Sequence, residues 1–382
     1  MFEQITAREL ADDIDADEDG YAIVDTRPED SYGSWHVPGA ANVPFGPAET
    51  LDDEQEAAVD EHADDDSIVT ICGKGATSTT LAAELDAAGY DDVAVVKGGM
   101  RDWNALYEQA RVDTSDDVGI MQFQRRGKGC LSYLVGSPDA EEAVVVDPTR
   151  HIEQFVVAAA EHGVEITHVL DTHVHADHVS GGRELADKLD VPYHLGARAE
   201  ERDLQYEFES LEDGDTIHVG DVEITALAEP GHTTEMVNYR VGDEAILTGD
   251  ALFVDSVGRT ELEFGDDDAE NGAEMAYETL HETLTALPDD LTVLPGHVTV
   301  TSDGRFENGS PGEPVSAPLE TVEGQLDLLG LDRDEFVERL VEDVPAKPAN
   351  YETVIDINIG RERPESSRQA AKLETGANNC AA

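Results

Sequence analysis

The feature that most constrains this 382-residue chain is a histidine-rich segment, residues 172–182, which reads Thr-His-Val-His-Ala-Asp-His-Val-Ser-Gly-Gly. Neutral imidazole and carboxylate are the ligands that zinc and non-haem iron prefer, and a tight turn lets several such groups converge on one point. Because the chain has only 13 histidines, three within six positions favour a metal-binding loop over a solvated polar one. The candidate ligands are His173, His175, Asp177 and His178.

Three later segments each place a potential ligand beside a glycine at the end of an apolar run. These ligands are His232 in Pro-Gly-His-Thr, Asp250 in Leu-Thr-Gly-Asp and His297 in Leu-Pro-Gly-His. Such a position projects a side chain from a rigid sheet edge at low backbone cost. Each segment alone is compatible with a simple turn or a helix cap. In this order after the histidine-rich loop, however, they predict one metal centre.

Acidic residues dominate the composition, with 86 Asp and Glu against 24 Lys and Arg and a net charge of −62. A polyanion repels nucleic acid and anionic lipid, so we expect neither as a partner. The acids are spread along the chain, for example over 11–19 and 265–268, instead of forming one tail. Concentrated salt screens such self-repulsion. We therefore expect a halophilic, salt-requiring protein of the cytoplasm.

The three cysteines, Cys72, Cys130 and Cys380, lie far apart and suggest no disulfide framework, which favours a reducing compartment. We interpret Cys130 as a small buried residue and assign no role to Cys380. The N-terminus lacks a basic region followed by an apolar core, and no run reaches the roughly 18 to 20 apolar residues of a membrane span. The sequence therefore predicts neither export nor a membrane anchor.

Alternating helix-like and strand-like segments divide the chain into two globular parts. In the first part, short β-branched runs at 22–25, 67–71 and 93–96 and a helix ending at Gly89 predict an α/β domain with a mainly parallel sheet. In the second, a strand at 166–170 leads into the histidine-rich loop, which is where α/β architectures place chemistry. The expected limits are a first domain at 1–110, a linker at 111–119, a second domain at 120–302, and an extension at 303–382 that packs on the second domain and is loosely held at its end.

Over residues 120 to 300 the order His-x-His-x-Asp-His, His, Asp, His resembles the metallo-β-lactamase fold, an αββα sandwich whose ligands line one sheet edge. The resemblance implies two potential metal positions. His173, His175 and His232 would surround the first, and Asp177, His178 and His297 the second, with Asp250 able to bridge them. Dizinc hydrolases, diiron flavoproteins and mononuclear iron oxygenases all use this fold, so the fold alone does not decide the chemistry.

Narrower features resemble the persulfide dioxygenases, namely residues 172–182 and the stretch Gly-Asp-Ala-Leu-Phe-Val-Asp-Ser-Val-Gly-Arg-Thr at 249–260, where Glu261 follows in place of the usual aspartate. This resemblance implies one Fe²⁺ ion, which oxidises a small thiol persulfide with O₂ to sulfite and thiol. Its ligands would be His173, His232 and Asp250, a 2-His-1-carboxylate face with open positions.

The other polar residues of the centre would then have supporting roles. His175, Asp177, His178 and His297 would orient ligands and water, and Arg259 would serve substrate placement or an internal ion pair. One motif departs from the subfamily, because Pro-Gly-His at 295–297 replaces the usual Pro-Ala-His and also occurs in hydrolases. A dizinc glyoxalase II-like thioester hydrolase, with Zn²⁺ as the metal, therefore remains the alternative.

Cys72 follows the strand at 67–71 and begins Cys-Gly-Lys-Gly-Ala-Thr-Ser before a helix, where backbone amides and the helix dipole stabilise a thiolate. This loop, with 24–27, 36–40 and 96–103, resembles a rhodanese domain covering residues 3 to 109. The resemblance implies transfer of sulfane sulfur through a persulfide on Cys72. The loop residues that would cradle this sulfur with backbone N–H groups are Gly73, Lys74, Gly75, Ala76, Thr77 and Ser78.

The Cys72 loop also departs from its family, because many active members carry arginine where this chain has Thr77. Two interpretations stay open: a sulfurtransferase with weak or altered activity, and a silent module that only binds a sulfur-carrying partner. We expect Asp25 and Arg27 to hold the fold. The leading hypothesis is thus an iron-dependent dioxygenase coupled to a rhodanese-type domain, with the thiol, the direction of sulfur flow and any homo-oligomer left open.

Overall fold

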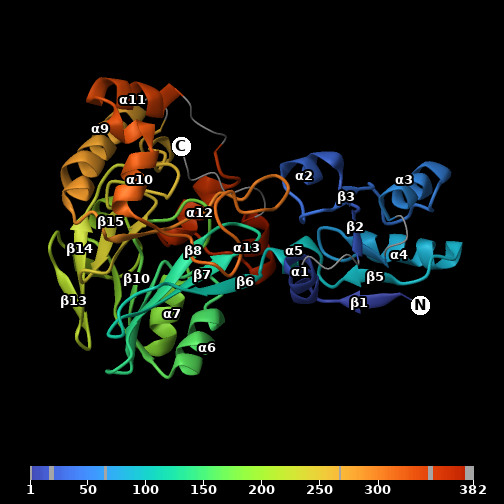
Figure 1. The fold of residues 1–382 in the computed structure, drawn as a ribbon, viewed down its shortest axis with the longest axis horizontal. Coiled ribbons are helices and arrows are strands. Elements are labelled where there is room, and N and C mark those ends of the chain that lie inside the picture. The colour runs from blue at the N-terminus through green and yellow to red at the C-terminus, as the bar shows by residue number, and fades with distance from the viewer. Residues whose placement is uncertain (1, 17–20, 64–66, 266–267, 343–346, 375–382) are drawn as a thin grey trace. The chain divides into compact units, whose positions relative to one another are not determined.

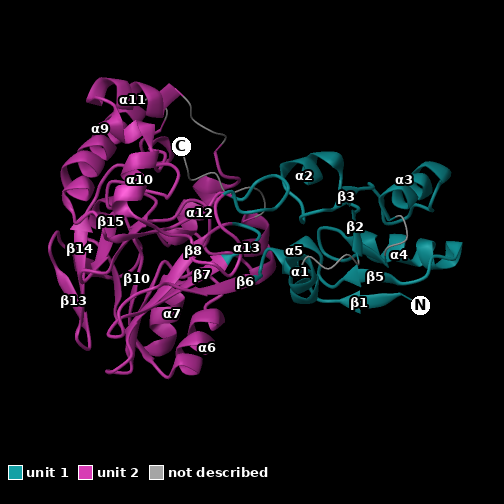
Figure 2. Ribbon diagram, viewed as in Figure 1, with its two compact units in different colours: residues 1–106, 125–128, 300–307 teal, residues 107–124, 129–299, 308–382 magenta. Residues whose placement is uncertain are grey.

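The structure is a computed structural model that describes residues 2–16, 21–63, 67–265, 268–342 and 347–374. The chain forms two compact units (Figure 2). Unit 1 comprises Met1–Leu106, Arg125–Lys128 and Val300–Glu307, and unit 2 comprises Tyr107–Gln124, Gly129–Thr299 and Asn308–Ala382. Among the described residues, none of the helices is both long and apolar enough to cross a membrane.

Unit 1 is built on a five-stranded parallel sheet with the order β1-β5-β4-β2-β3. Side chains alternate across the sheet, so Val69 and Ile71 of β4 enter one apolar cluster while Ile68 enters another on the opposite face. This confirms the predicted α/β domain. Its elements are β1 Glu3–Ile5, α1 Ala7–Asp15, β2 Tyr21–Asp25, α2 Glu29–Ser34, β3 Ala41–Asn42, α3 Asp53–Ala63, β4 Ser67–Ile71, α4 Thr77–Ala88, β5 Val93–Val96 and α5 Met100–Trp103.

Unit 2 contains two sheets with helices on their outer faces (Figure 1), which confirms the predicted sandwich. The seven-stranded sheet has the order β12-β11-β10-β9-β8-β7-β6 and is covered by α6 and α7. Its elements are β6 Tyr107–Arg111, β7 Gly119–Arg125, β8 Leu131–Ser137, β9 Glu142–Val146, α6 Glu153–His162, β10 Glu165–Leu170, α7 Gly182–Leu189, β11 Tyr193–Gly196, the 3-10 helix Ala197–Arg202 and β12 Glu209–Leu211.

The six-stranded sheet has the order β13-β14-β15-β16-β17-β18 and packs against α9, α10 and α11. Its strands are β13 Thr216–Val219, β14 Val222–Ala228, β15 Val237–Val241, β16 Ala245–Gly249, β17 Thr292–Pro295 and β18 Ala317–Pro318. The helices that follow β16 are α8 Glu261–Phe264, α9 Ala269–Glu278, a π-helix at Thr279–Thr283, 3-10 helices at Leu284–Ala286 and Asp327–Gly330, α10 Leu319–Gln325, α11 Arg333–Glu342, α12 Tyr351–Asn358 and α13 Ser367–Leu373.

The contact boundary between the units lies between Leu106 and Tyr107, because β6 joins the sheet of unit 2. The linker expected at 111–119 therefore lies between β6 and β7. Residues 300–307 belong to unit 1, where the backbone N–H of His36 donates to the carbonyl of Ser302 over 3.0 Å. The boundary between the units thus depends on strand pairing and on backbone hydrogen bonds. A polar run in the sequence predicts neither of these.

The C-terminal extension is tied to unit 2 as far as Glu374. The buried Glu374 carboxylate accepts a hydrogen bond from the backbone N–H of Val179 over 3.0 Å and pairs with Arg150 over 2.8 Å. The sequence analysis expected this end to be loosely held. Residues 375–382, with Cys380, lie outside the described residues.

Connections that follow strands of both sheets of unit 2 bring the predicted ligands together. Parallel pairing of β16 with β17 sets Gly249 opposite Pro295, so the residues after these strands, Asp250 and His297, are neighbours. The approach requires Gly296, since a Cβ atom there would lie 2.5 Å from Asp250 Oδ1. The sheet register thus fixes the site before any ion binds.

Candidate functional site

The first ligand group consists of His173, His232 and Asp250, whose ligand atoms all lie within 4.8 Å of one another and are buried. Asp250 Oδ2 lies 3.8 Å from His173 Nε2 and 3.7 Å from His232 Nε2. The three residues follow β10, β14 and β16 respectively. The structure therefore brings together the three residues that the sequence predicted as ligands of one metal ion.

Hydrogen bonds fix which nitrogen each of these histidines presents to the group. His232 Nδ1 donates to the carbonyl of Arg259 over 2.6 Å. His173 Nδ1 lies 2.9 Å from Thr172 Oγ1, and that hydroxyl donates to the Asp147 carboxylate. The hydroxyl must therefore accept from His173, so both rings carry hydrogen on Nδ1. Each keeps a free lone pair on Nε2, which is the form that binds a metal.

Two atoms of the first ligand group, His173 Nε2 and Asp250 Oδ2, are buried without a hydrogen-bond partner among the described residues. A buried polar atom left unpaired costs about 1–3 kcal/mol, which is why such atoms are rare. Two histidines and one carboxylate on one face form the donor set typical of non-haem Fe²⁺. The residues present therefore fit a divalent metal ion with open coordination positions.

The charge state of Asp250 also suits a ligand. Burial alone would raise the pKa of this carboxyl, but the neighbouring His297, with His173 and His232, holds it well below its usual range. An ionised carboxylate is the form that coordinates a cation.

His175 lies beside the first ligand group instead of within it. Its Nε2 atom lies 3.2 Å from Asp147 Oδ1, and it forms a separate cluster with Asp147 and Asp171. The backbone carbonyls of His175 and His178 both accept from the side-chain amide of Asn358, each over 2.8 Å. Asn358 belongs to α12, so the C-terminal extension holds the histidine-rich loop in place.

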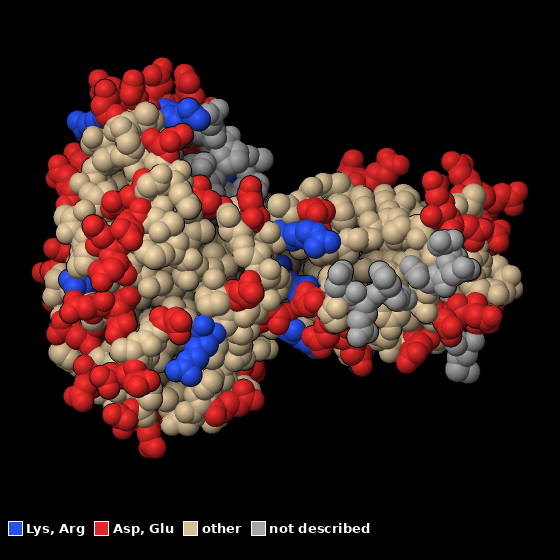
Figure 3. Space-filling model, in the orientation of Figure 1, with Lys and Arg blue, Asp and Glu red and all other residues tan. Residues whose placement is uncertain are grey.

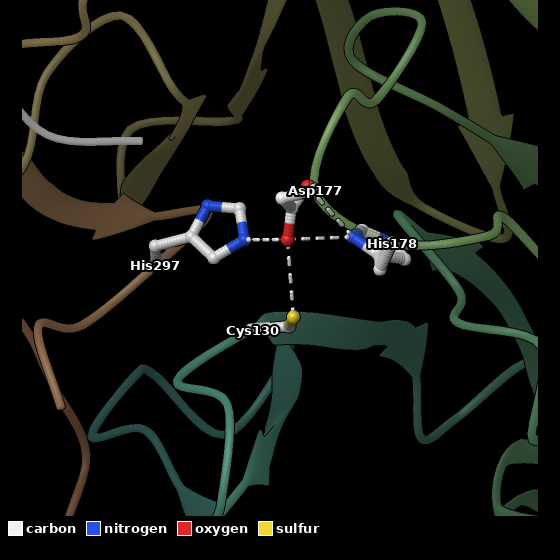
Figure 4. A group of neighbouring side chains, drawn as sticks. All are labelled: Cys130, Asp177, His178 and His297. Carbon is white, nitrogen blue, oxygen red and sulfur yellow. Dashed lines mark hydrogen bonds and ion pairs between the residues drawn. The ribbon is translucent and has the colours of Figure 1, made fainter. Parts of the chain in front are cut away.

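A second cluster, the cysteine-containing group, consists of Cys130, Asp177, His178 and His297 (Figure 4). Asp177 Oδ2 lies at its centre, 2.9 Å from His297 Nε2, 3.1 Å from His178 Nδ1 and 3.4 Å from Cys130 Sγ. The other ring nitrogen of His297, Nδ1, lies 2.6 Å from Asp250 Oδ1. His297 therefore connects the cysteine-containing group to the first ligand group.

Cys130 is the member of this group that the sequence analysis missed. It is buried as expected, but its sulfur faces polar groups instead of an apolar core. Burial and the charge of Asp177 would raise the pKa of the thiol, yet His178 and His297 outweigh them and lower it to about 7. The only signal in the sequence was the residue type, since cysteine is a metal ligand, and its partners lie far along the chain.

Arg259 makes an internal ion pair, which is one of the two roles that the sequence suggested for it. Its guanidinium is buried and its Nε donates to Glu261 Oε1 over 2.6 Å, which forms an internal ion pair. Gly258 brings the same segment against the site, because a Cβ atom there would collide with the carbonyl of Asp250. The Arg259 side chain thus holds the segment whose backbone carbonyl positions His232.

The Cys72 loop connects β4 to α4 in unit 1, and its backbone and hydroxyl groups surround the sulfur. The N–H of Gly75 donates to Cys72 Sγ over 3.1 Å, and Ser78 Oγ donates over 3.3 Å. Burial alone would raise the pKa of the thiol, but hydrogen bonds from Ser78, Thr77 and the loop backbone lower it to about 7. This lowered pKa favours the thiolate, the form needed for nucleophilic attack.

The other residues in and near this loop are either exposed or bonded to neighbouring side chains. Thr77, which stands where arginine is common, shares a 2.8 Å hydrogen bond with Thr26. Lys74 is exposed, as are Gly73 and Ala76. Arg27 pairs with the buried Asp25 over 2.7 Å. These contacts agree with the expectation that Asp25 and Arg27 hold the fold.

Two family models match this chain. Residues 6–106 match the model described as Rhodanese-like domain. Residues 125–297 match the model described as Metallo-beta-lactamase superfamily. The two matches fall on consecutive parts of the chain, in the order that the sequence analysis predicted.

Two kinds of curated enzyme resemble part of this chain. Persulfide dioxygenase ETHE1 is 31% identical in Bos taurus and 32% in Homo sapiens, over 44% of this chain and 65% and 63% of those proteins. The chain thus spans slightly less than two thirds of these relatives. Hydroxyacylglutathione hydrolase of Rhodopseudomonas palustris is 31% identical over 52% of this chain and 73% of that protein.

Solved structures resemble the chain at the level of the fold. A metallo-beta-lactamase from Staphylococcus aureus subsp. aureus COL has a TM-score of 0.57 at 25% identity, covering 66% of this chain and 76% of its own. ETHE1 from Myxococcus xanthus has a TM-score of 0.53 at 24% identity, covering 68% and 99%.

Proposed function

The chain belongs to the metallo-β-lactamase superfamily and carries a rhodanese-like domain at its N-terminus, and from this premise we propose that it is an iron-dependent persulfide dioxygenase. The proposed substrates are a low-molecular-weight thiol persulfide and O₂. The balanced reaction is RSSH + O₂ + H₂O → RSH + SO₃²⁻ + 2H⁺. The observation that carries the proposal is the first ligand group, in which two histidines and one carboxylate converge with unpaired donor atoms.

The residues of this site would have different roles: some would bind the metal ion and others would position those ligands. His173, His232 and Asp250 would hold Fe²⁺, which supplies binding of the persulfide sulfur and activation of O₂. Thr172 and the Arg259 carbonyl fix the two imidazoles by their Nδ1 atoms. His297 donates to the oxygen of Asp250 that faces away from the first ligand group, Oδ1, and so orients Oδ2 toward it. Burial of all these groups excludes water, which strengthens each electrostatic contact.

A second candidate function is a dizinc thioester hydrolase. It is favoured by the similarity to the hydroxyacylglutathione hydrolase of Rhodopseudomonas palustris, of which the match covers 73%, against 65% of the persulfide dioxygenase of Bos taurus. It is also compatible with the cysteine-containing group as a second metal position. In that alternative the rhodanese-like domain would only bind a sulfur-carrying partner.

One experiment separates the two candidates. Protein loaded with Fe²⁺ in high salt is given a thiol persulfide, and both O₂ uptake and sulfite are measured. The proposal expects one sulfite for each O₂ consumed. Two zinc ions per chain, no O₂ uptake and turnover of a thioester would reject the dioxygenase and establish the hydrolase.

For the N-terminal domain we propose sulfurtransferase activity at Cys72. The support is the lowered pKa of the thiol and the hydrogen bonds that its sulfur receives from Gly75 and Ser78. One contact comes from the loop and the other from the first turn of α4, so neither depends on the arginine that Thr77 replaces. Thiocyanate formation from thiosulfate and cyanide tests the activity, and its absence would favour a silent binding module.

We also propose that the protein works in the cytoplasm at high salt. On the face shown in Figure 3, Asp and Glu are spread over both units and Lys and Arg are few. Self-repulsion of this surface destabilises the folded chain unless salt screens it. Thermal melts should therefore show a higher Tm in molar KCl than in low salt, and equal values would contradict the proposal.

A further inference from the structure

A buried carboxylate holds the backbone beside His173. Glu235 is 1% exposed, and its Oε1 atom accepts a hydrogen bond from the N–H of Val174 over 2.9 Å. Val174 follows His173, so this bond fixes the planar peptide unit that joins the two residues. Nearby, the N–H of Val237 donates to the carbonyl of Thr172 over 2.9 Å. The segment that carries Glu235 is thus bonded to the histidine-rich loop on both sides of His173.

A second carboxylate holds the backbone beside His232. Glu263, in α8, accepts from the N–H of Thr234 over 2.7 Å and from its hydroxyl over 2.6 Å. Thr234 lies two positions after His232. The same helix begins two residues after Arg259, whose carbonyl accepts from His232 Nδ1. The segment around α8 therefore holds His232 at two points, its ring and the backbone that follows it.

Arg202 joins these two carboxylates. It ends the 3-10 helix Ala197–Arg202, and its Nη1 atom lies 2.6 Å from Glu235 Oε2 and 2.8 Å from Glu263 Oε2. The helix can approach because Gly196 precedes it, since a Cβ atom there would lie 2.3 Å from the carbonyl oxygen of Glu235. The Arg202 side chain is only 12% exposed, so salt screens its ion pairs much less than those at the surface.

We propose that Arg202 is a positioning residue of the metal centre, which sets the separation of His173 and His232 by bonding both carboxylates. One cation bonded to Glu235 and Glu263 fixes the distance between them, and each carboxylate fixes the backbone beside one histidine. Without the cation, the two negative charges would repel each other and the buried one would be left unpaired. The inference rests on the proposed function only in taking the first ligand group as a metal position, and it holds for Fe²⁺ and for Zn²⁺.

The test measures how tightly the first ligand group binds Co²⁺, whose visible absorption bands report the geometry of its ligands. Apo protein is titrated anaerobically in high salt, and the signal that Asp250→Ala removes identifies the ion of this group. Arg202→Met keeps most of the length of the side chain but removes its charge. It should weaken this ion about 10- to 100-fold, as the loss of other partners of metal ligands does, and shift its absorption bands.

Two further variants separate positioning from general stability. Arg202→Lys should restore the affinity to within a few-fold of the wild type, because both contacts use one nitrogen and an ammonium group can donate to two carboxylates. Arg198→Met is the matched control. It lies in the same 3-10 helix and loses the same charge, but its ion pair with Glu201 is exposed. This control should keep the affinity and the absorption bands of the wild type.

The possible outcomes are distinct. Wild-type affinity and bands in Arg202→Met would overturn the proposal, even with a lower Tm, because the ion pairs would then only stabilise the fold. A lysine variant no better than the methionine variant would also overturn it. If Arg202→Met does not fold, Glu263→Gln takes its place. That change removes a partly exposed charge and should weaken the ion roughly 10-fold, and an unchanged affinity would overturn the proposal. Failure of the dioxygenase proposal would appear separately, as absent O₂ uptake by the iron-loaded wild-type protein.

Discussion

The Cys72 loop and the first ligand group hold their reactive atoms in opposite ways. Cys72 receives its hydrogen bonds from Gly75 and Ser78, which lie a few positions further along the same loop. His173 and Asp250 come from distant segments, and each has a buried donor atom with no hydrogen-bond partner in the described parts of the chain. The contacts of the first site form as the chain folds, whereas the second site has donor atoms that a metal ion would satisfy. Local backbone geometry therefore governs the first, and tertiary packing governs the second.

The largest expected effect comes from Asp250→Ala, which removes the only carboxylate of the first ligand group. Loss of a residue that only supports a metal ligand lowers metal affinity about 10- to 100-fold, and loss of the ligand Asp250 should lower it by more. O₂ uptake with persulfide should disappear. Equilibrium dialysis and O₂ uptake measure both. The alkylation rate of Cys72 serves as the control and should not change, and retention of metal at wild-type affinity would contradict the assignment.

Cys72→Ser should abolish sulfur transfer completely, since no other described cysteine lies in a comparable loop. O₂ uptake with free persulfide should stay at the wild-type value, because the first ligand group contains no residue of unit 1. Thiocyanate formation and O₂ uptake are measured on the same preparation. Loss of both activities would show that the two sites do not work independently.

A smaller effect is expected for Thr172→Val, which keeps the side-chain shape but removes the hydroxyl between Asp147 and His173. Without that acceptor the His173 ring loses its preferred hydrogen position, so metal affinity should fall about 10- to 100-fold. Thr172→Ser restores the hydroxyl and should restore the affinity. Equal metal affinity of the valine and serine variants would rule out this supporting role.

The smallest effect is expected for Ser78→Ala, which removes one hydrogen bond to the Cys72 sulfur. This bond favours the thiolate, so its loss raises the pKa of Cys72 from about 7. The lower end of the range for a hydrogen bond to a charged group, about 1.5 kcal/mol, corresponds to about one pKa unit and predicts roughly 7-fold slower alkylation at pH 7. The midpoint of the rate against pH should therefore move to higher pH.

A matched control is Thr80→Ala, whose hydroxyl bonds the carbonyl of Ala76 and not the sulfur. Its alkylation profile should match the wild type. If the Ser78 variant also kept the wild-type midpoint, the backbone N–H groups alone would stabilise the thiolate.

Much of the fold was predictable because its signals are local. Short β-branched runs such as 67–71 became buried parallel strands, and Gly89 ends α4 in the left-handed conformation as its glycine predicted. The limits of the domains were harder to predict from the sequence. β6 joins unit 2 because its backbone groups find partners there, and that choice depends on the whole sheet.

The candidate ligands were predictable for a related reason. Asp250 and His297 follow β16 and β17, which are parallel and end at the same edge of the six-stranded sheet, and His173 follows β10 of the seven-stranded sheet. The supporting contacts were not predictable. Nothing near Cys130 in the sequence indicates Asp177, and nothing near the histidine-rich loop indicates Asn358.

The sequence by itself therefore determined the residue types of both sites and the order in which they occur, because these depend on short motifs beside strands. Only the tertiary structure decided which of those residues lie next to one another and which atoms they present. The register of β16 with β17 placed His297 between Asp250 and Asp177, and the β-bridge at Cys130 turned a buried cysteine toward polar partners. Hydrogen bonds between residues far apart in the chain exist only after the sheets are packed, so no local pattern encodes them.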